Sequence, residues 1–117
     1  MTINSRQKGK RGELEISKIL REHGYEARRA MQYSGYNGDA DIITNIPGYH
    51  WEIKRVENLN LDKAMDQSMR DAKEGEVPIV AHRKNGKEWK VTLHLEDFIK
   101  LLKEAEDDKQ DTEEANQ

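Results

Sequence analysis

Cysteine is absent from the 117 residues, so neither a disulfide framework nor a thiolate metal site is available. Long apolar runs are also missing, and no stretch approaches the length of a membrane span. No signal peptide is visible in the polar and then basic N-terminal segment, and no internal repeat is evident. Together with the length, these absences predict a soluble, cytoplasmic protein with one domain.

Hydrophobic residues are scarce, at 34% of the chain with a mean hydropathy of -1.07, but the polarity is uneven. Residues 104–117 contain seven acids, one lysine and no large apolar residue, which predicts a disordered acidic tail. Residues 1–103, the expected folded domain, contain 19 basic and 16 acidic residues, a net charge of +3 against -3 for the whole chain. The acidic balance of the chain is therefore no argument against a nucleic-acid partner.

Apolar periodicity and turn residues divide residues 1–103 into short elements. Helices are predicted over 9–23, 61–74 and 95–103, and strands over 25–31, 39–44, 49–56, 77–83 and 88–94. The turn at 45–48 predicts a hairpin between the second and third strands, and Asn85-Gly86 predicts another between the last two. Phe98, Leu101 and Leu102 are expected to face inward. The layout is α+β, with helices packed on a small mixed sheet.

The tripeptide Glu52-Ile53-Lys54 is the most informative motif. Residues two apart on a strand point to the same side of a sheet, so the acid and the lysine should lie together. Asp41, eleven positions before Glu52, lies on the preceding predicted strand and adds a second carboxylate. Carboxylate oxygens are the ligands that Mg²⁺ prefers, and a lysine beside them can act on a phosphate or a water. The combination suggests a metal-dependent phosphodiesterase.

Acid-x-Lys occurs four times in this charged chain, so context must select among the matches. Asp71-x-Lys73 falls in a helical pattern, where residues two apart do not face each other, and Asp107-x-Lys109 falls in the polar tail. Glu88-x-Lys90 follows a strand without an acid. Glu52-x-Lys54 is the match with an acid-bearing strand just upstream, which favours a functional role. The alternative is that Glu52 and Lys54 belong to a cross-strand pair on the surface.

The element order and these residues resemble the PD-(D/E)XK nuclease superfamily, and within it the small Holliday-junction resolvases of the archaeal and phage type. The matching segments, within residues 8–103, are 9–13 (GKRGE), Arg29 with Ser34 and Gly35, 41–43 (DII) and 52–54 (EIK). The family's proline before the aspartate is replaced by Ala40. Asp39 offers a competing carboxylate on the same strand face and could support the site or substitute for Asp41, which we take as the principal acid.

The resemblance implies a restriction-endonuclease-like core over residues 1–103 and an Mg²⁺-dependent endonuclease acting on DNA, with Mn²⁺ as a possible substitute. Asp41 and Glu52 would bind one or two ions, with the carbonyl of Ile53 as a further ligand and Glu13 reaching in from the first helix. Lys54 would orient the attacking water or stabilise charge on the phosphate. Alone, Glu13 would be interpreted as a solvated helix acid or a cap partner.

The residues expected to contact DNA are basic, apart from one serine: Arg6, Lys8, Lys10, Arg11, Arg29, Ser34 and Arg55. The alternative for the first four is a solvated basic helix start, although positive charge there opposes the macrodipole and favours an anionic ligand. Gln67 could reach the site from the second helix. His50 shares a strand face with Glu52 and is interpreted as a bystander. Trp51 and Trp89 are expected in the core.

Symmetric cutting of a four-way junction needs two active sites related by a two-fold axis, so the resemblance implies a homodimer. Recombination, repair and phage DNA processing are all compatible roles. Three functions stay open: a junction-resolving or branched-DNA endonuclease, a nuclease of the same fold acting on duplex or flap DNA, and a non-catalytic DNA-binding module. A small α+β domain whose charges only solvate it would require all four segment matches to be coincidental.

Overall fold

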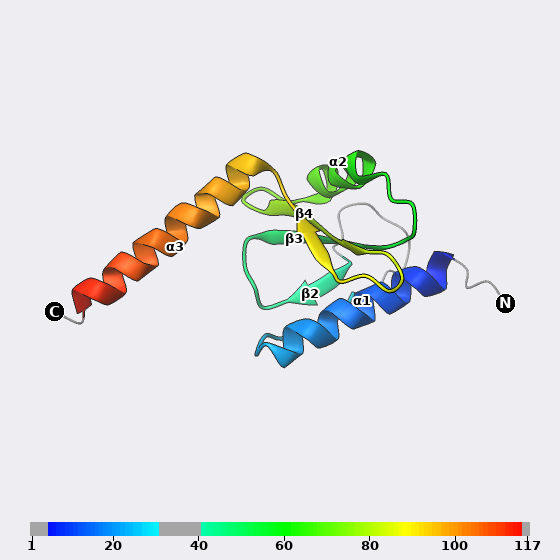
Figure 1. Cartoon of the computed structure of the whole chain (residues 1–117), viewed down its shortest axis with the longest axis horizontal. Coiled ribbons are helices and arrows are strands. Elements are labelled where there is room, and N and C mark those ends of the chain that lie inside the picture. Colours follow the sequence, from blue (N-terminus) through cyan, green and yellow to red (C-terminus); the bar gives the residue numbers. More distant parts are fainter. Residues whose placement is uncertain (1–4, 31–40, 116–117) are drawn as a thin grey trace.

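The computed structural model describes the backbone of residues 5–30 and 41–115, and the side chains of residues 9–30 and 41–110. The elements follow in the order α1 (Ser5–Glu22), β1 (Ala27–Arg29), β2 (Ile42–Thr44), β3 (Tyr49–Arg55), α2 (Leu61–Asp71), β4 (Val77–Arg83), β5 (Lys90–Thr92) and α3 (Leu95–Ala115) (Figure 1). This is the order that the sequence predicts, so the α+β fold class is confirmed. Among the described helices, none combines the length and apolar character that a membrane span requires.

The described strands form two small sheets. One contains β3, β4 and β5 in that order, with β3 and β4 parallel and β4 and β5 antiparallel. The other pairs β1 with β2 antiparallel. The predicted hairpin between residues 39–44 and 49–56 is wrong over the described residues, because β2 takes β1 as its ladder partner and β3 takes β4. A backbone hydrogen bond, from the amide of Asp41 to the carbonyl of Trp51 at 3.3 Å, joins the two sheets.

The core lies on both faces of the three-stranded sheet. Ala81 of β4 packs in one cluster with Ile16, Ile42 and Ile53, and the partly buried Trp51 and Trp89 pack against that cluster, as expected. Val80, the preceding residue, packs in a second cluster with Ala64 and Met65 of α2. Because successive strand residues point to opposite faces, α1 and α2 cover opposite sides of the sheet.

Gly12 allows α1 to approach β3 closely. A Cβ atom at this position would lie 3.2 Å from the Cβ of Arg55 and 3.4 Å from both the Cγ2 of Ile53 and the ring of Trp89. A larger residue would push the helix away from the strand. The glycine therefore sets the depth at which α1 presents its next residue, Glu13.

Helix α3 differs most from the sequence prediction. Its expected end at Lys103 is wrong, because the helix continues to Ala115 through a segment rich in good helix formers such as Glu and Ala. Residues 104–115, expected to be disordered, are helical here, and Figure 1 shows α3 pointing away from the sheet. Phe98 and Leu102 are 46% and 47% exposed rather than turned inward, since this part of α3 has no core to cover. The boundary between a domain at 1–103 and a tail stays a prediction.

Candidate active site

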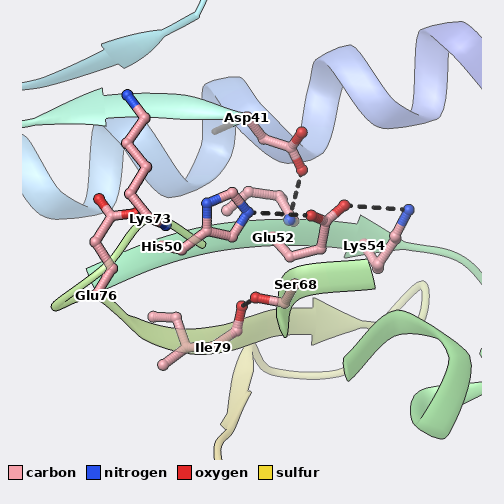
Figure 2. A network of polar contacts seen from close by, with 9 residues as sticks. Asp41, His50, Glu52, Lys54, Ser68, Lys73, Glu76 and Ile79 are labelled. Carbon is pink, nitrogen blue, oxygen red and sulfur yellow. Dashed lines mark hydrogen bonds and ion pairs between the residues drawn. The ribbon is translucent and has the colours of Figure 1, made fainter. Parts of the chain in front are cut away.

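Strand β3 places Glu52 and Lys54 on one face of the sheet, as their spacing predicts. Glu52 is 3% exposed, and its Oε2 lies 3.5 Å from the Nζ of Lys54, whose side chain is partly exposed. Figure 2 shows the two side chains directed toward each other along the strand. The predicted proximity of the acid and the lysine is confirmed by this ion pair.

Asp41 lies immediately before β2 and is fixed by the backbone of β3. Its Oδ2 accepts a hydrogen bond from the amide of Ile53 at 2.7 Å (Figure 2). Burial, followed by the negative charge of Glu52, raises the pKa of Asp41 from 3.8 to about 7, while the Ile53 hydrogen bond acts in the opposite direction. Asp41 therefore stands in a site that already contains another buried acid.

Glu13 reaches this site from α1. Its Oε2 forms an ion pair with the Nε of Arg29 at 2.5 Å, and its side chain is 12% exposed. Burial raises the pKa of Glu13, the Arg29 contact opposes that rise, and the charge of Glu52 adds to it. The helix and two strand regions thus bring Glu13, Asp41 and Glu52 into one electrostatically coupled cluster.

The acid cluster fits a hard divalent cation. The charge of Glu52 raises the pKa values of both Glu13 and Asp41, so the three carboxylic acids are electrostatically coupled through mutual repulsion. A divalent cation relieves such repulsion, and Mg²⁺ takes carboxylate oxygens while keeping several waters. Carboxylates of this kind have the chemistry for such an ion, while the described group whose ligand atoms lie within 4.8 Å of one another is His50, Glu52 and Asp71. Whether Glu13, Asp41 and Glu52 hold the ion, with Lys54 beside Glu52, stays a prediction.

The other predicted residues lie in different surroundings. Lys10 and Arg11 are exposed on α1, and Gln67 is half-buried on α2. Arg6 and Lys8 belong to α1, but their side chains lie outside the described ones, as do Ser34 and Asp39 altogether. The Ile53 side chain packs in the core. The DNA contacts of these residues, the metal-ligand role of the Ile53 carbonyl and the supporting roles of Asp39 and Gln67 stay predictions.

Arg55 is engaged on the α1 side of the sheet. Its Nε lies 3.1 Å from Oε2 of Glu15, and Nη2 of Arg83 lies 3.0 Å from Oε1 of the same glutamate. Arg83 also stacks over Trp89, with its guanidinium carbon 5.7 Å from the ring centre. Arg55 is thus already paired within the protein, and its predicted contact with DNA phosphates stays a prediction.

Two further residues lie beside Glu52: His50, which sequence analysis placed there and interpreted as a bystander, and Asp71, which it missed. His50 is 1% exposed, and its Nε2 lies 3.5 Å from Oε1 of Glu52. Asp71, at the end of α2, offers a carboxylate oxygen within 4.8 Å of ligand atoms of both residues. The shared strand face of His50 and Glu52 was a usable signal. The approach of Asp71 was not visible in the sequence, because it depends on how α2 crosses the sheet.

Two comparisons with known proteins bear on this site. Residues 4–116 match the model of a protein family described as "Phage putative PDDEXK endonuclease". The fold is similar to that of Hjc from Archaeoglobus fulgidus, a Holliday junction resolvase, with a TM-score of 0.56 and 21% identity, over 71% of this chain and 74% of that chain. At this identity the likeness shows a shared fold. No curated protein matches the chain significantly.

Proposed function

Because the chain belongs to the phage PDDEXK endonuclease family, we propose that it is an Mg²⁺-dependent endonuclease that hydrolyses phosphodiester bonds of branched DNA. We place the reaction at Glu13, Asp41, Glu52 and Lys54. The observation that carries the proposal is the electrostatic coupling of Glu13, Asp41 and Glu52, with Lys54 paired to Glu52, where α1, β2 and β3 meet. A phage nuclease of this kind would act on DNA in the cytoplasm of the host.

The three acids would hold the ion and the lysine would act on the phosphate. Bound Mg²⁺ supplies a polarised phosphate oxygen and a water of lowered pKa. The Ile53 amide fixes the orientation of Asp41, and Arg29 does the same for Glu13. Lys54, which is 30% exposed, extends its ammonium toward the solvent side of the cluster, where it would orient the attacking water or stabilise charge on the phosphate.

We assign branched DNA, and four-way junctions in particular, as the substrate class. The motif residues resemble those of junction resolvases, and the fold is similar to that of one such protein. The exposed Lys10 and Arg11 offer sequence-independent phosphate contacts on α1, the helix that also carries Glu13. A branched substrate is distinguished from duplex by the angle between its arms rather than by its bases, which suits contacts of this kind.

Junction resolution would require a homodimer, since two strands must be cut symmetrically. The apolar residues of α3 provide a surface for such an assembly: Leu95 is 69% exposed, and Phe98 and Leu102 are about half exposed. Light scattering coupled to size exclusion should give twice the chain mass, and Phe98→Glu should shift the mass toward the monomer. A monomer at all concentrations of the unaltered protein would contradict the dimer.

The decisive experiment is cleavage of a labelled four-way junction and of linear duplex with the same sequence, in Mg²⁺ and in EDTA. Paired symmetric cuts confined to the junction, lost in EDTA and in Asp41→Asn, are the expected result. Equal cleavage of both substrates would retain the active site but overturn the branched-DNA substrate. Binding without cleavage of either substrate would overturn the catalytic proposal and leave a DNA-binding module.

A further inference from the structure

His50 presents a buried nitrogen whose contact with Glu52 is a long ion pair rather than a well-formed hydrogen bond. The residue is 1% exposed, and its Nε2 is among the buried polar atoms without a hydrogen-bond partner. Its neighbour in β3, Glu52, approaches to 3.5 Å, which is longer than a hydrogen bond between these atoms. Buried polar atoms are nearly always satisfied, so an imidazole nitrogen in this state calls for a ligand.

Asp71, on α2, brings a second carboxylate close to His50 and Glu52 of β3. It is the last residue of α2, where a negative side chain is disfavoured by the macrodipole unless a cation lies nearby. The helix itself is anchored: the buried Ser68 donates a hydrogen bond to the carbonyl of Ile79 at 3.0 Å (Figure 2). The position of Asp71 relative to β3 is therefore set by packing and by this bond.

His50, Glu52 and Asp71 each offer a ligand atom, and these atoms all lie within 4.8 Å of one another. In a tetrahedral site with ligand bonds of about 2.0 Å, ligand atoms are about 3.3 Å apart. The 3.5 Å between His50 and Glu52 is already near that spacing. The charge of Glu76, together with those of Glu52 and Asp71, acts on His50 and makes the surroundings negative. Imidazole nitrogen and carboxylate oxygen are both ligands that Zn²⁺ takes in proteins.

We propose that His50, Glu52 and Asp71 form a second divalent-metal site, selective for a transition metal such as Zn²⁺, next to the acid cluster that holds Mg²⁺. The imidazole provides the selectivity, because nitrogen ligands suit Zn²⁺ and Mg²⁺ prefers oxygen. Glu52 links the two sites through its two oxygens: Oε1 faces His50 and Oε2 faces Lys54. The inference rests on the proposed function only in that Glu52 belongs to both sites.

A filled second site would position Glu52 for the reaction. A metal bound to Oε1 would fix the orientation of the Glu52 carboxylate, in the way that hydrogen-bonding partners commonly orient metal ligands. Oε2 would then stay directed to the acid cluster. In the structure, Glu52 forms ion pairs with His50 and Lys54. The second metal is thus a positioning element rather than a participant in the hydrolysis.

The test is calorimetric titration of the tag-free protein with ZnCl₂, without DNA. One Zn²⁺ per chain is expected, with affinity reduced about tenfold or more in His50→Gln and in Asp71→Asn. Asp41→Asn should retain Zn²⁺ affinity, because Asp41 belongs to the other site. His94→Gln is the matched control: it removes an exposed histidine that also has an aspartate nearby, with His94 Nδ1 lying 3.9 Å from Asp97.

Absence of Zn²⁺ binding in the unaltered protein, or unchanged affinity in both His50→Gln and Asp71→Asn, would overturn the second site. Loss of binding in His94→Gln would do the same, because it would place the ion on the surface. Asp71 is only partly buried, so its variant keeps the test valid if His50→Gln does not fold. The Mg²⁺ cleavage assay is separate: cleavage without Zn²⁺ binding refutes this inference alone, and Zn²⁺ binding without cleavage refutes the nuclease proposal alone.

Discussion

Glu13 and Glu15 are two residues apart on α1 and lie in opposite electrostatic surroundings. Glu15 lies between two guanidinium groups, those of Arg55 and Arg83, so its charge is more than compensated. Glu13 has Arg29 as a partner, yet it also faces two further acids, Asp41 and Glu52. The first arrangement pairs opposite charges between the helix and the sheet. The second has three neighbouring acids, whose mutual repulsion the proposed cation would offset.

The largest expected difference between the surroundings of Glu13 and those of Glu15 is their effect on the cleavage rate. Asp41→Asn should lower the cleavage rate by about 10³-fold, since it removes a ligand of the ion that stabilises the transition state. Glu15→Gln should leave cleavage largely intact but cost about 1–3 kcal/mol of stability, because two partly buried guanidinium groups lose their partner. Single-turnover cleavage and urea unfolding measure the two effects. Equal loss of cleavage in both variants would remove the distinction between the regions.

The acid cluster should also make stability depend on pH when no divalent metal is present. The folded-state pKa of Asp41, about 7, lies above its ordinary value of 3.8, so the folded state holds this proton more tightly than the unfolded state. The resulting stabilisation is fully present below about pH 4 and is lost as the pH rises through 7, on the order of 4 kcal/mol.

Urea unfolding in EDTA across this pH range tests the effect. Asp41→Asn should flatten the decline, because its side chain carries no titrating proton. Asp66→Asn, which changes an exposed acid on α2, should leave the decline in place. A decline of the same size in Asp41→Asn would show that another group causes it.

Mg²⁺ should reverse this destabilisation at neutral pH. An ion that binds only the folded state stabilises it by about 2.7 kcal/mol at 100 times its dissociation constant. The gain should appear as a higher melting temperature in the unaltered protein and in Glu15→Gln. It should be small in Asp41→Asn, where one carboxylate is missing. Equal Mg²⁺ stabilisation of all three proteins would locate the ion elsewhere on the chain.

The sequence predicted the local part of this comparison and missed the part that depends on tertiary packing. Strand alternation was enough to put Glu52 beside Lys54, and helix and strand periodicity gave the element order. The pairing of β2 with β1 was missed, because the turn at 45–48 looked like a hairpin turn. The ion network of Glu15 and the approach of Asp71 to His50 depend on how α1 and α2 lie on opposite faces of the sheet. No spacing in the chain records those contacts.

Gly12 connects the Glu13 and Glu15 regions. It precedes Glu13 on α1, and it packs closely against Arg55, a partner of Glu15. A valine there places branched carbons against Arg55 and Ile53, so α1 must move outward, at a cost of about 1–3 kcal/mol. A Cβ atom at Gly9 would meet no other atom within 4 Å, so Gly9→Ala should instead stabilise α1 by about 0.5–1 kcal/mol. Gly12→Val should therefore lose both stability and cleavage, while Gly9→Ala loses neither. Retained cleavage in a destabilised Gly12→Val would mean that Glu13 reaches the acid cluster without the close helix–strand contact, and that the two regions are held independently.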